Sequence, residues 1–192
     1  MHRYPARAMY NQLGDALRSI TMQLRSAIEA DARDRRVNGA TGPLQRKSGW
    51  ARQLSAELAS VLLATLGLAA TIEWHVRQFQ NCTGIPCELT VNNAAGFDLP
   101  EDYAETIFDI YTDALSNVAR HAAASHVAIA LTITSREVVL IVADNGVGLG
   151  DGASAAGGLA VIRARAQTYK GSCEVAGTRN GGTTVTVSLP IP

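Results

Sequence analysis

Two consecutive valine- and isoleucine-rich segments in the second half of the chain constrain its fold most strongly. His126 to Thr134 and Glu137 to Ala143 are separated only by Ser135 and Arg136. Residues of these types are enriched in strands because their side chains pack well on a pleated surface. The second segment runs directly into a glycine-containing loop, Asp144 to Gly148. The chain is therefore predicted to contain a β-sheet with such a loop at the end of an apolar strand.

The segments around these strands predict further helices and strands. Pro100 opens a helix that runs to about His121, since proline is favoured at the first helical position. Gly158 to Lys170 is also typical of a helix. Three more segments predict strands: Ile85 to Val91, Ser172 to Val175 and Thr183 to Leu189. Because strands and helices do not alternate strictly, we expect an α+β fold with helices on one face of the sheet.

The first third of the chain predicts a helical hairpin. Apolar residues recur every three or four positions from Ala8 to Ile28 and again from Trp50 to Leu62, whereas Asp31 to Ser48 is polar and contains helix-breaking residues. Two helices bury little apolar surface by themselves, so we expect a homodimer in which two hairpins form a four-helix bundle. A boundary near Ala64 then gives a dimerisation hairpin over residues 1–64 and a second domain over residues 65–192.

The helix that leaves the hairpin is expected to be interrupted and then to continue. The interruption is predicted at Leu66 to Leu68, around Gly67. Apolar residues at helical spacing follow at Leu68, Ile72, Val76 and Phe79. Thr83 and Gly84 provide a stop of the usual glycine type, so the shorter helix should end there.

Charge and hydropathy restrict the partners that the chain could have. Seventeen basic and seventeen acidic residues give a formal net charge of zero, which provides no basic field for a nucleic-acid backbone. The longest uncharged run, Leu58 to Ile72, is shorter than the roughly 20 apolar residues of a spanning helix. Met1 to Pro5 leads into an amphipathic stretch, unlike a signal peptide. We therefore expect a cytoplasmic protein that neither binds nucleic acid nor inserts directly into a membrane.

Two polar elements precede and follow the first strand pair. In the loop Asp144 to Gly148, glycine lets the backbone approach a ligand that a Cβ atom would exclude, although such a sequence is also common in plain turns. On the preceding helix, Asp113 and Asn117 are four residues apart and share a face with Arg120. Magnesium prefers oxygen ligands, so Asn117 could bind it, Asp113 could orient water and Arg120 could contact phosphate. A solvated polar face is the alternative interpretation.

Two further glycine-rich segments complete the pattern. Ala156 to Leu159 opens a helix whose free N–H groups could receive phosphate. Gly181 to Thr184 precedes the last strand. Each segment alone could be a turn, but their order and combination are specific to one known arrangement.

From roughly Ala8 to Pro190 the chain resembles the dimerisation and catalytic region of sensor histidine kinases of the nitrate-sensor and membrane-fluidity-sensor type. Thr112 to Ala122 resembles the family's N box, usually written Q-E-A-L-T-N-x-x-[KR]-H-A, and Asp144 to Gly148 matches its first glycine box. The resemblance implies an α/β sandwich ATP-binding domain of the Bergerat (GHKL) type, shared with gyrase, heat-shock chaperone and mismatch-repair ATPases.

The resemblance also implies roles for individual residues. Asp144 would accept a hydrogen bond from the adenine amino group, and Thr183 would support it through water. Asn117 would bind magnesium, while Arg120 and His121 would lie near the phosphates. The implied ATP contacts also include the glycine loops, at Gly146, Gly148, Gly157, Gly158, Leu159 and Gly182.

The chain departs from the family at the phosphoacceptor. The family motif is close to L-H-D-x-L-G-Q, and here Tyr10 and Asn11 stand in place of the histidine and its neighbouring acid. A phenol with a pKa of about 10 is mostly protonated at neutral pH, and an amide cannot act as the base that the acid provides. In addition, Asp113 stands where glutamate is usual and Ala156 replaces the first lid glycine. ATP binding is therefore expected to survive better than self-phosphorylation.

Three functions remain compatible with the sequence. The first is an ATP-binding histidine-kinase homologue that signals by dimerisation or by engaging a partner histidine kinase or response regulator. The second is an active kinase that phosphorylates a histidine on another protein. The third is a non-histidine member of the same ATPase superfamily, such as an anti-sigma-type serine kinase, against which the N-terminal hairpin argues.

Overall fold

The computed structural model describes residues 44–93, 96–148, 158–177 and 181–192. The chain divides into two compact units, residues 1–67 and 68–192, which are described separately. The predicted first helix, Tyr10 and Gly157 lie outside the described residues. The predicted division into a dimerisation hairpin, residues 1–64, and an ATP-binding domain, residues 65–192, therefore stays a prediction.

In the first unit, the structure describes the N-terminal part of helix α2 (Leu44–Thr83). The helix begins at Leu44, within the segment up to Ser48 that was expected to be a loop. Residues 45–47 are glutamine, arginine and lysine, which are good helix formers and continue the helix toward its N-terminus.

Helix α2 is interrupted at Gly67, as the sequence predicts. Gly67 has φ 80° and ψ 175°, a conformation outside the helical region. The helix ends at Thr83, where the N–H of Gly84 donates to the carbonyl of Gln80 at 2.8 Å and Gly84 adopts φ 74°. Between these glycines, the residues predicted to form an apolar stripe are buried in the second unit: Leu68, Ile72, Val76 and Phe79.

The stretch Ala59–Thr83 of this helix is long and apolar enough to cross a membrane, judged by length and composition. It extends beyond the uncharged run Leu58 to Ile72. Its most apolar window has a mean hydropathy of 1.4 and is 39% buried. Core helices of soluble proteins also pass this test of length and composition.

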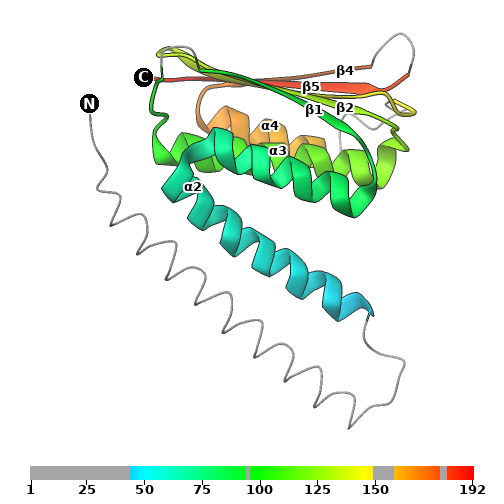
Figure 1. Ribbon diagram of the computed structural model, residues 1–192. Coiled ribbons are helices and arrows are strands. Elements are labelled where there is room, and N and C mark those ends of the chain that lie inside the picture. The colour runs from blue at the N-terminus through cyan, green and yellow to red at the C-terminus, as the bar shows by residue number, and fades with distance from the viewer. Residues whose placement is uncertain (1–43, 94–95, 149–157, 178–180) are drawn as a thin grey trace. The chain divides into compact units, whose positions relative to one another are not determined.

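The second unit contains one five-stranded mixed sheet, in the order β1-β2-β3-β5-β4. Its strands are β1 (Cys87–Asn92), β2 (Val127–Ile133), β3 (Glu137–Asp144), β4 (Ser172–Gly177) and β5 (Thr183–Pro190). Strand β1 pairs with β2 in parallel, and the other pairs are antiparallel. Helices α3 (Glu101–Asn117) and α4 (Gly158–Thr168) lie on the same face of this sheet (Figure 1). The predicted α+β sandwich is confirmed.

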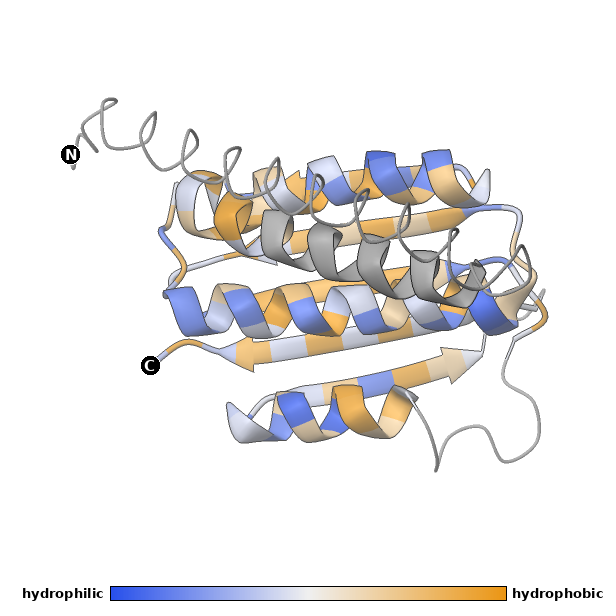
Figure 2. Ribbon diagram, turned by 90° about the horizontal axis from the view of Figure 1, so that it is seen from below, coloured by the Kyte–Doolittle hydropathy of each residue, from blue (hydrophilic) through white to orange (hydrophobic). Residues whose placement is uncertain are grey.

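Alternation along the central strands makes the core. In β2, Val127, Ile129 and Leu131 are at most 2% exposed, while the intervening residues face away from the helices. Ile107, Ile110 and Leu115 of α3 are equally buried. Each such side chain contributes about 1.5–3 kcal/mol on burial. Seen from the helix side, α3 and α4 lie side by side over the sheet (Figure 2).

The predicted helix from Pro100 to His121 differs in its last turn. The α-helical hydrogen bonding ends at Asn117, and Val118–Ala122 forms a π-helical turn, η1. The turn closes at Ala123, which adopts φ 47°. Wider turns of this kind re-aim side chains and are frequent at functional sites. Here the turn carries two of the predicted site residues, Arg120 and His121.

Candidate functional site

Asp144 is the last residue of β3 and one of the few buried charged residues of the described chain. Its side chain is 9% exposed. Its Oδ1 accepts hydrogen bonds from the N–H of Gly146 at 2.8 Å and from the N–H of Thr183 at 3.3 Å. A carboxylate that is held by two backbone donors has a fixed orientation and little conformational freedom. Asp144 therefore joins the loop after β3 to the start of β5.

Three backbone segments meet around Asp144 because glycine allows them to approach. A methyl group on Gly146 would overlap the carbonyl of Ala122, and one on Gly182 would overlap the carbonyl of Asp144. Gly148 adopts φ 80°, and a methyl group there would come within 3.2 Å of the Gly182 carbonyl oxygen. The structure thus brings together the predicted residues Gly146, Gly148, Gly182 and Thr183.

Asn145 fixes the same loop from its other side, a role that the sequence analysis missed. Its Oδ1 accepts from the N–H groups of Ser125 and His126, both at 2.9 Å. Its Nδ2 donates to the Ser125 hydroxyl at 2.9 Å. An asparagine before glycine is common in turns for its local hydrogen bonds, so the sequence signal was present but not specific to this anchor.

The second group of predicted residues lies at the end of α3. Asp113 and Asn117 are one turn apart on the helix. The Oδ2 atom of Asp113 and the Nδ2 atom of Asn117 are buried and have no hydrogen-bond partner in the part of the chain that is described. Most buried polar groups in proteins are hydrogen-bonded, so two neighbouring atoms without such a bond among the described residues point to a ligand, ion or water. Arg120 and His121 follow on η1, and both side chains are exposed.

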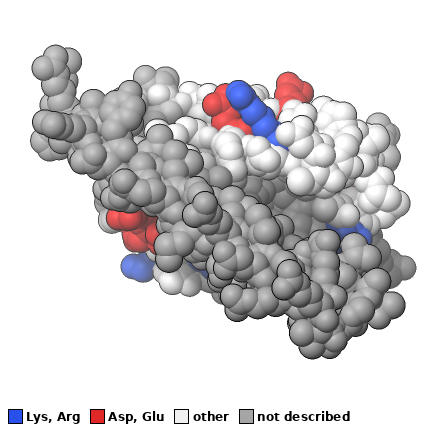
Figure 3. All heavy atoms as spheres, turned by 60° about the horizontal axis from the view of Figure 1, so that its bottom comes forward, with Lys and Arg blue, Asp and Glu red and all other residues white. Residues whose placement is uncertain are grey.

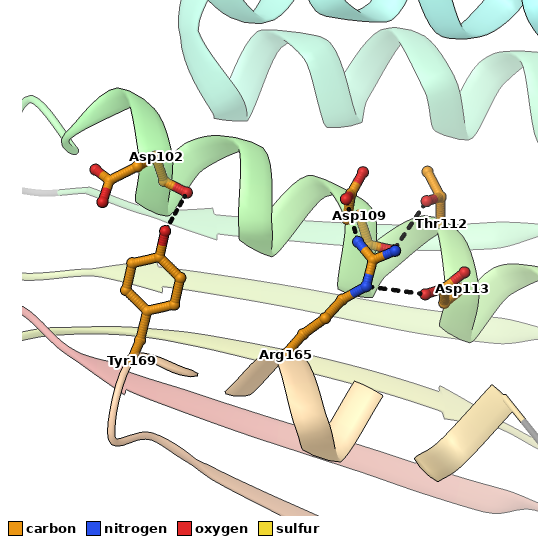
Figure 4. A network of polar contacts seen from close by, with 6 residues as sticks. All are labelled: Asp102, Asp109, Thr112, Asp113, Arg165 and Tyr169. Carbon is orange, nitrogen blue, oxygen red and sulfur yellow. Dashed lines mark hydrogen bonds and ion pairs between the residues drawn. The ribbon is translucent and has the colours of Figure 1, made fainter. Parts of the chain in front are cut away.

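The pKa of the Asp113 carboxylate is subject to opposing effects. Burial raises its pKa above the ordinary value, the neighbouring Asp109 raises it further, and Arg165 acts in the opposite direction. The Nε atom of Arg165 lies 3.6 Å from Asp113 Oδ2, and the same guanidinium pairs with Asp109 (Figure 4). No local sequence pattern relates Arg165 of α4 to residues of α3, so this contact could not be predicted.

The start of α4 packs on Asn117. A methyl group on Gly158 would come 2.5 Å from Asn117 Oδ1. The next residue, Leu159, is buried at 9% exposure and fixes the helix on the core. The predicted second glycine box therefore adjoins the predicted magnesium ligand. Its other glycine, Gly157, lies outside the described residues.

The residues at the end of α3 fit a magnesium ion that arrives with a nucleotide. A carboxylate and an amide oxygen are ligands that magnesium accepts, and this ion usually retains waters and binds substrate phosphates. Among the described residues, no group of three or more histidine, cysteine or acidic side chains could hold a metal alone. The ion would need phosphate and water oxygens to complete its coordination.

Among the described residues on the face that Figure 3 shows, the basic and acidic side chains form small groups of both signs. This distribution agrees with the net charge of zero.

Comparison with known proteins gives the class to which this fold and site belong. Residues 102–192 match the family described as histidine kinase-, DNA gyrase B-, and HSP90-like ATPase. This span includes α3, the loop after β3 and the loop before β5. The second unit is thus an ATPase domain of the GHKL type.

Curated relatives narrow the class. The chain is 30% identical over 142 residues to the histidine-protein kinase/phosphatase DegS of Brevibacillus brevis, covering 73% of this chain and 36% of DegS. It is 26% identical to the oxygen sensor histidine kinase NreB of Staphylococcus carnosus, covering 97% and 55%. It is 31% identical to the sensor histidine kinase NarS of Mycobacterium tuberculosis, covering 91% and 42%. These similarities support a histidine kinase of the nitrate-sensor subfamily, and the chain spans about half the length of these relatives or less.

Solved structures share the fold. The histidine kinase domain of the blue-light activated kinase from Erythrobacter litoralis superposes with a TM-score of 0.60 at 16% identity, covering 96% of this chain and 93% of that one. The histidine kinase AdeS of Acinetobacter baumannii gives a TM-score of 0.53 at 14% identity, covering 93% and 96%.

Proposed function

We propose that this chain binds magnesium-ATP in the site described above and acts in two-component signal transduction without phosphorylating itself. The observation that carries the proposal is two buried atoms without a hydrogen-bond partner among the described residues, Asp113 Oδ2 and Asn117 Nδ2, together with a glycine-containing loop that begins at a fixed carboxylate, Asp144. The end of the site at Asp144 has the chemistry to bind a nucleotide base. The end at Asp113 and Asn117 has the chemistry to bind phosphates and a cation.

The adenine end of the site consists of Asp144 and Thr183. A carboxylate that already receives two backbone N–H groups on Oδ1 is held still for a third donor, the adenine amino group. In this proposal Thr183 supports the same base through water. Gly146, Gly148 and Gly182 allow the backbone segments around Asp144 to pack closely, because a methyl group on any of them would meet neighbouring backbone.

The phosphate end consists of the last turn of α3 and the segments next to it. Magnesium, when bound, neutralises phosphate charge and fixes the position of the phosphate oxygens. Asn117 would bind it and Asp113 would orient one of its waters. Arg120 and His121 are exposed on η1 and can reach phosphates. The N–H groups at Gly157, Gly158 and Leu159 would receive phosphate at the start of α4.

The proposed lack of self-phosphorylation rests on the first predicted helix. Tyr10 and Asn11 occupy the positions of the family's phosphoacceptor histidine and its acidic neighbour. A neutral imidazole attacks phosphate readily once a carboxylate holds its other proton, whereas Tyr10 would be protonated and would lack that base. The chain would then signal as a homodimer through residues 1–64, by engaging a response regulator or a partner histidine kinase in the cytoplasm.

Labelled ATP tests this proposal. The protein is incubated with magnesium and γ-labelled ATP, and any label on the chain is treated with acid and with base. We expect nucleotide binding without an acid-labile, base-stable label. A label that survives base but not acid would mean that a histidine accepts phosphate and would contradict the proposed deficiency. Transfer of such a label to a histidine of an added partner would instead identify an active kinase acting on another protein.

A further inference from the structure

Arg165 of α4 contacts two carboxylates of the neighbouring helix α3. Its Nη1 pairs with Asp109 Oδ2, and its Nε lies 3.6 Å from Asp113 Oδ2. Figure 4 shows the guanidinium directed at both acids, which are one helical turn apart. The planar guanidinium presents several donors in a fixed geometry, whereas a lysine ammonium is a single point charge. One side chain of α4 therefore orients two acidic side chains of α3.

Asp113 depends on this contact more than Asp109 does. The Asp109 side chain is 58% exposed, so water can solvate it, whereas Asp113 Oδ2 is buried and forms no hydrogen bond with the described residues. Arg165 provides the favourable charge near Asp113, while burial and Asp109 both act against its ionised form. Without Arg165, the buried oxygen would have neither a cation nor a donor from the described residues to hold it in place.

The two helices are also joined at other points. At the far end of the interface, the Tyr169 hydroxyl donates to the carbonyl of Asp102 at 3.3 Å, and its ring lies 4.6 Å from that of Tyr103. At the near end, Gly158 packs on Asn117. The Arg165 side chain is 36% exposed, and ion pairs at this exposure contribute little to stability. Attachment of α4 to α3 therefore does not require Arg165.

We propose that Arg165 is a positioning residue of the nucleotide site, which holds the Asp113 carboxylate beside Asn117 in the orientation that receives a water of the magnesium ion of ATP. Arg165 acts through Asp113 and does not itself touch the nucleotide. The inference rests on the proposed function. It predicts that loss of Arg165 affects the contribution of magnesium to ATP binding and leaves the rest of the binding energy unchanged.

Calorimetry of ATP binding by the full chain tests this role. Affinity is measured with magnesium and again with EDTA in its place, for the wild type, Arg165→Gln, Arg165→Lys and Tyr169→Phe. Residues that orient metal ligands typically contribute 10- to 100-fold to metal affinity, so we expect Arg165→Gln to weaken binding about tenfold in magnesium. Its affinity in EDTA and its melting temperature should stay near the wild-type values. Arg165→Lys should recover part of the lost affinity, because lysine keeps the positive charge but lacks the planar guanidinium with its several donors.

Tyr169→Phe is the matched control, since it removes another polar contact with α3, made by the residue that follows α4, and keeps the aromatic ring. It should bind ATP like the wild type under both conditions. Equal weakening of Arg165→Gln with and without magnesium, or equal effects of Arg165→Gln and Tyr169→Phe, would overturn the positioning role. A wild type that gains nothing from magnesium would overturn it while leaving ATP binding intact. A wild type that binds no ATP would overturn the proposed function itself.

Discussion

Asp144 and Thr183 are 39 residues apart in the chain, yet the carboxylate of the first accepts a hydrogen bond from the backbone of the second at 3.3 Å. The contact exists because β3 and β5 are antiparallel neighbours, which brings the end of one strand to the start of the other. The Asp144 side chain therefore has two roles: it hydrogen-bonds the start of β5, and it is the proposed contact of the adenine base. Substitutions at Asp144 can separate these two roles.

Asp144→Asn should keep both backbone hydrogen bonds, because an amide oxygen can still accept from the N–H groups of Gly146 and Thr183. Asp144→Ala removes the acceptor and leaves two backbone donors without it, at a cost of about 1–3 kcal/mol. We therefore expect the free energy of unfolding in urea to fall clearly for the alanine variant and little for the asparagine variant. Equal losses for both would show that the charge, and not the hydrogen bonds, stabilises the loop.

Gly146→Ala should disrupt the meeting point of the three loops. The added methyl group would overlap the carbonyl of Ala122, a backbone atom that cannot move without displacing η1. Overpacking of this kind should lower the free energy of unfolding by about 3 kcal/mol. Gly84→Ala is the control, since nothing lies within 4 Å of its added methyl group and only the positive φ opposes it. That strain costs about 1 kcal/mol, and a Gly146→Ala variant no less stable than Gly84→Ala would contradict the described packing.

Asp113→Asn should stabilise the protein at neutral pH while weakening magnesium-ATP binding. Because burial raises the pKa of Asp113 in the folded state, ionisation is disfavoured there relative to the unfolded chain. The penalty is absent in acid and appears as the pH rises through the carboxyl range, so the gain in melting temperature should grow in the same direction. Asp109→Asn, which removes an exposed carboxylate of the same helix, should give no such gain. A lower melting temperature for Asp113→Asn at neutral pH would show that the contact with Arg165 outweighs burial.

His75 should make stability fall on mild acidification. Its ring lies between α2 and α3, with Nδ1 3.2 Å from the Tyr111 hydroxyl, and burial lowers its pKa. The unfolded chain therefore takes up a proton first as the pH falls below about 6.5, and stability is lost through the range down to the lowered pKa. Between about pH 7.5 and about pH 5.5, the melting temperature of the wild type should fall more than that of His75→Phe. Identical pH profiles would show that His75 does not contribute.

Much of the fold follows from local sequence. Strands β2 and β3 have the composition and length expected of them, and Gly67 and Gly84 interrupt and end α2 where the sequence predicts. These elements are determined by neighbouring residues, which is the information that periodicity and glycine placement contain. The turn that the glycines after Asp144 form could be predicted for the same reason, whereas their role in a site stays a prediction that rests on the family resemblance.

The features that were not predicted depend on contacts between distant segments. The π-helical turn at Val118–Ala122 ends where the carbonyl of Ala122 accepts from the N–H of Val147, so its geometry is coupled to the loop after β3. The pairing of Arg165 with Asp113 requires the register of α4 on α3. Such registers are set by the packing of buried side chains, and no local pattern in either helix contains them.

Calorimetric titration of the full chain with ATP in the presence of magnesium tests the central claim most directly, with Asp144→Asn measured beside the wild type. The account predicts saturable binding by the wild type with one ATP per chain, strengthened by magnesium, and at least tenfold weaker binding by Asp144→Asn because an amide cannot offer the same charged acceptor to the adenine amino group. Absence of binding by the wild type, or unchanged affinity in a folded Asp144→Asn variant, would contradict it.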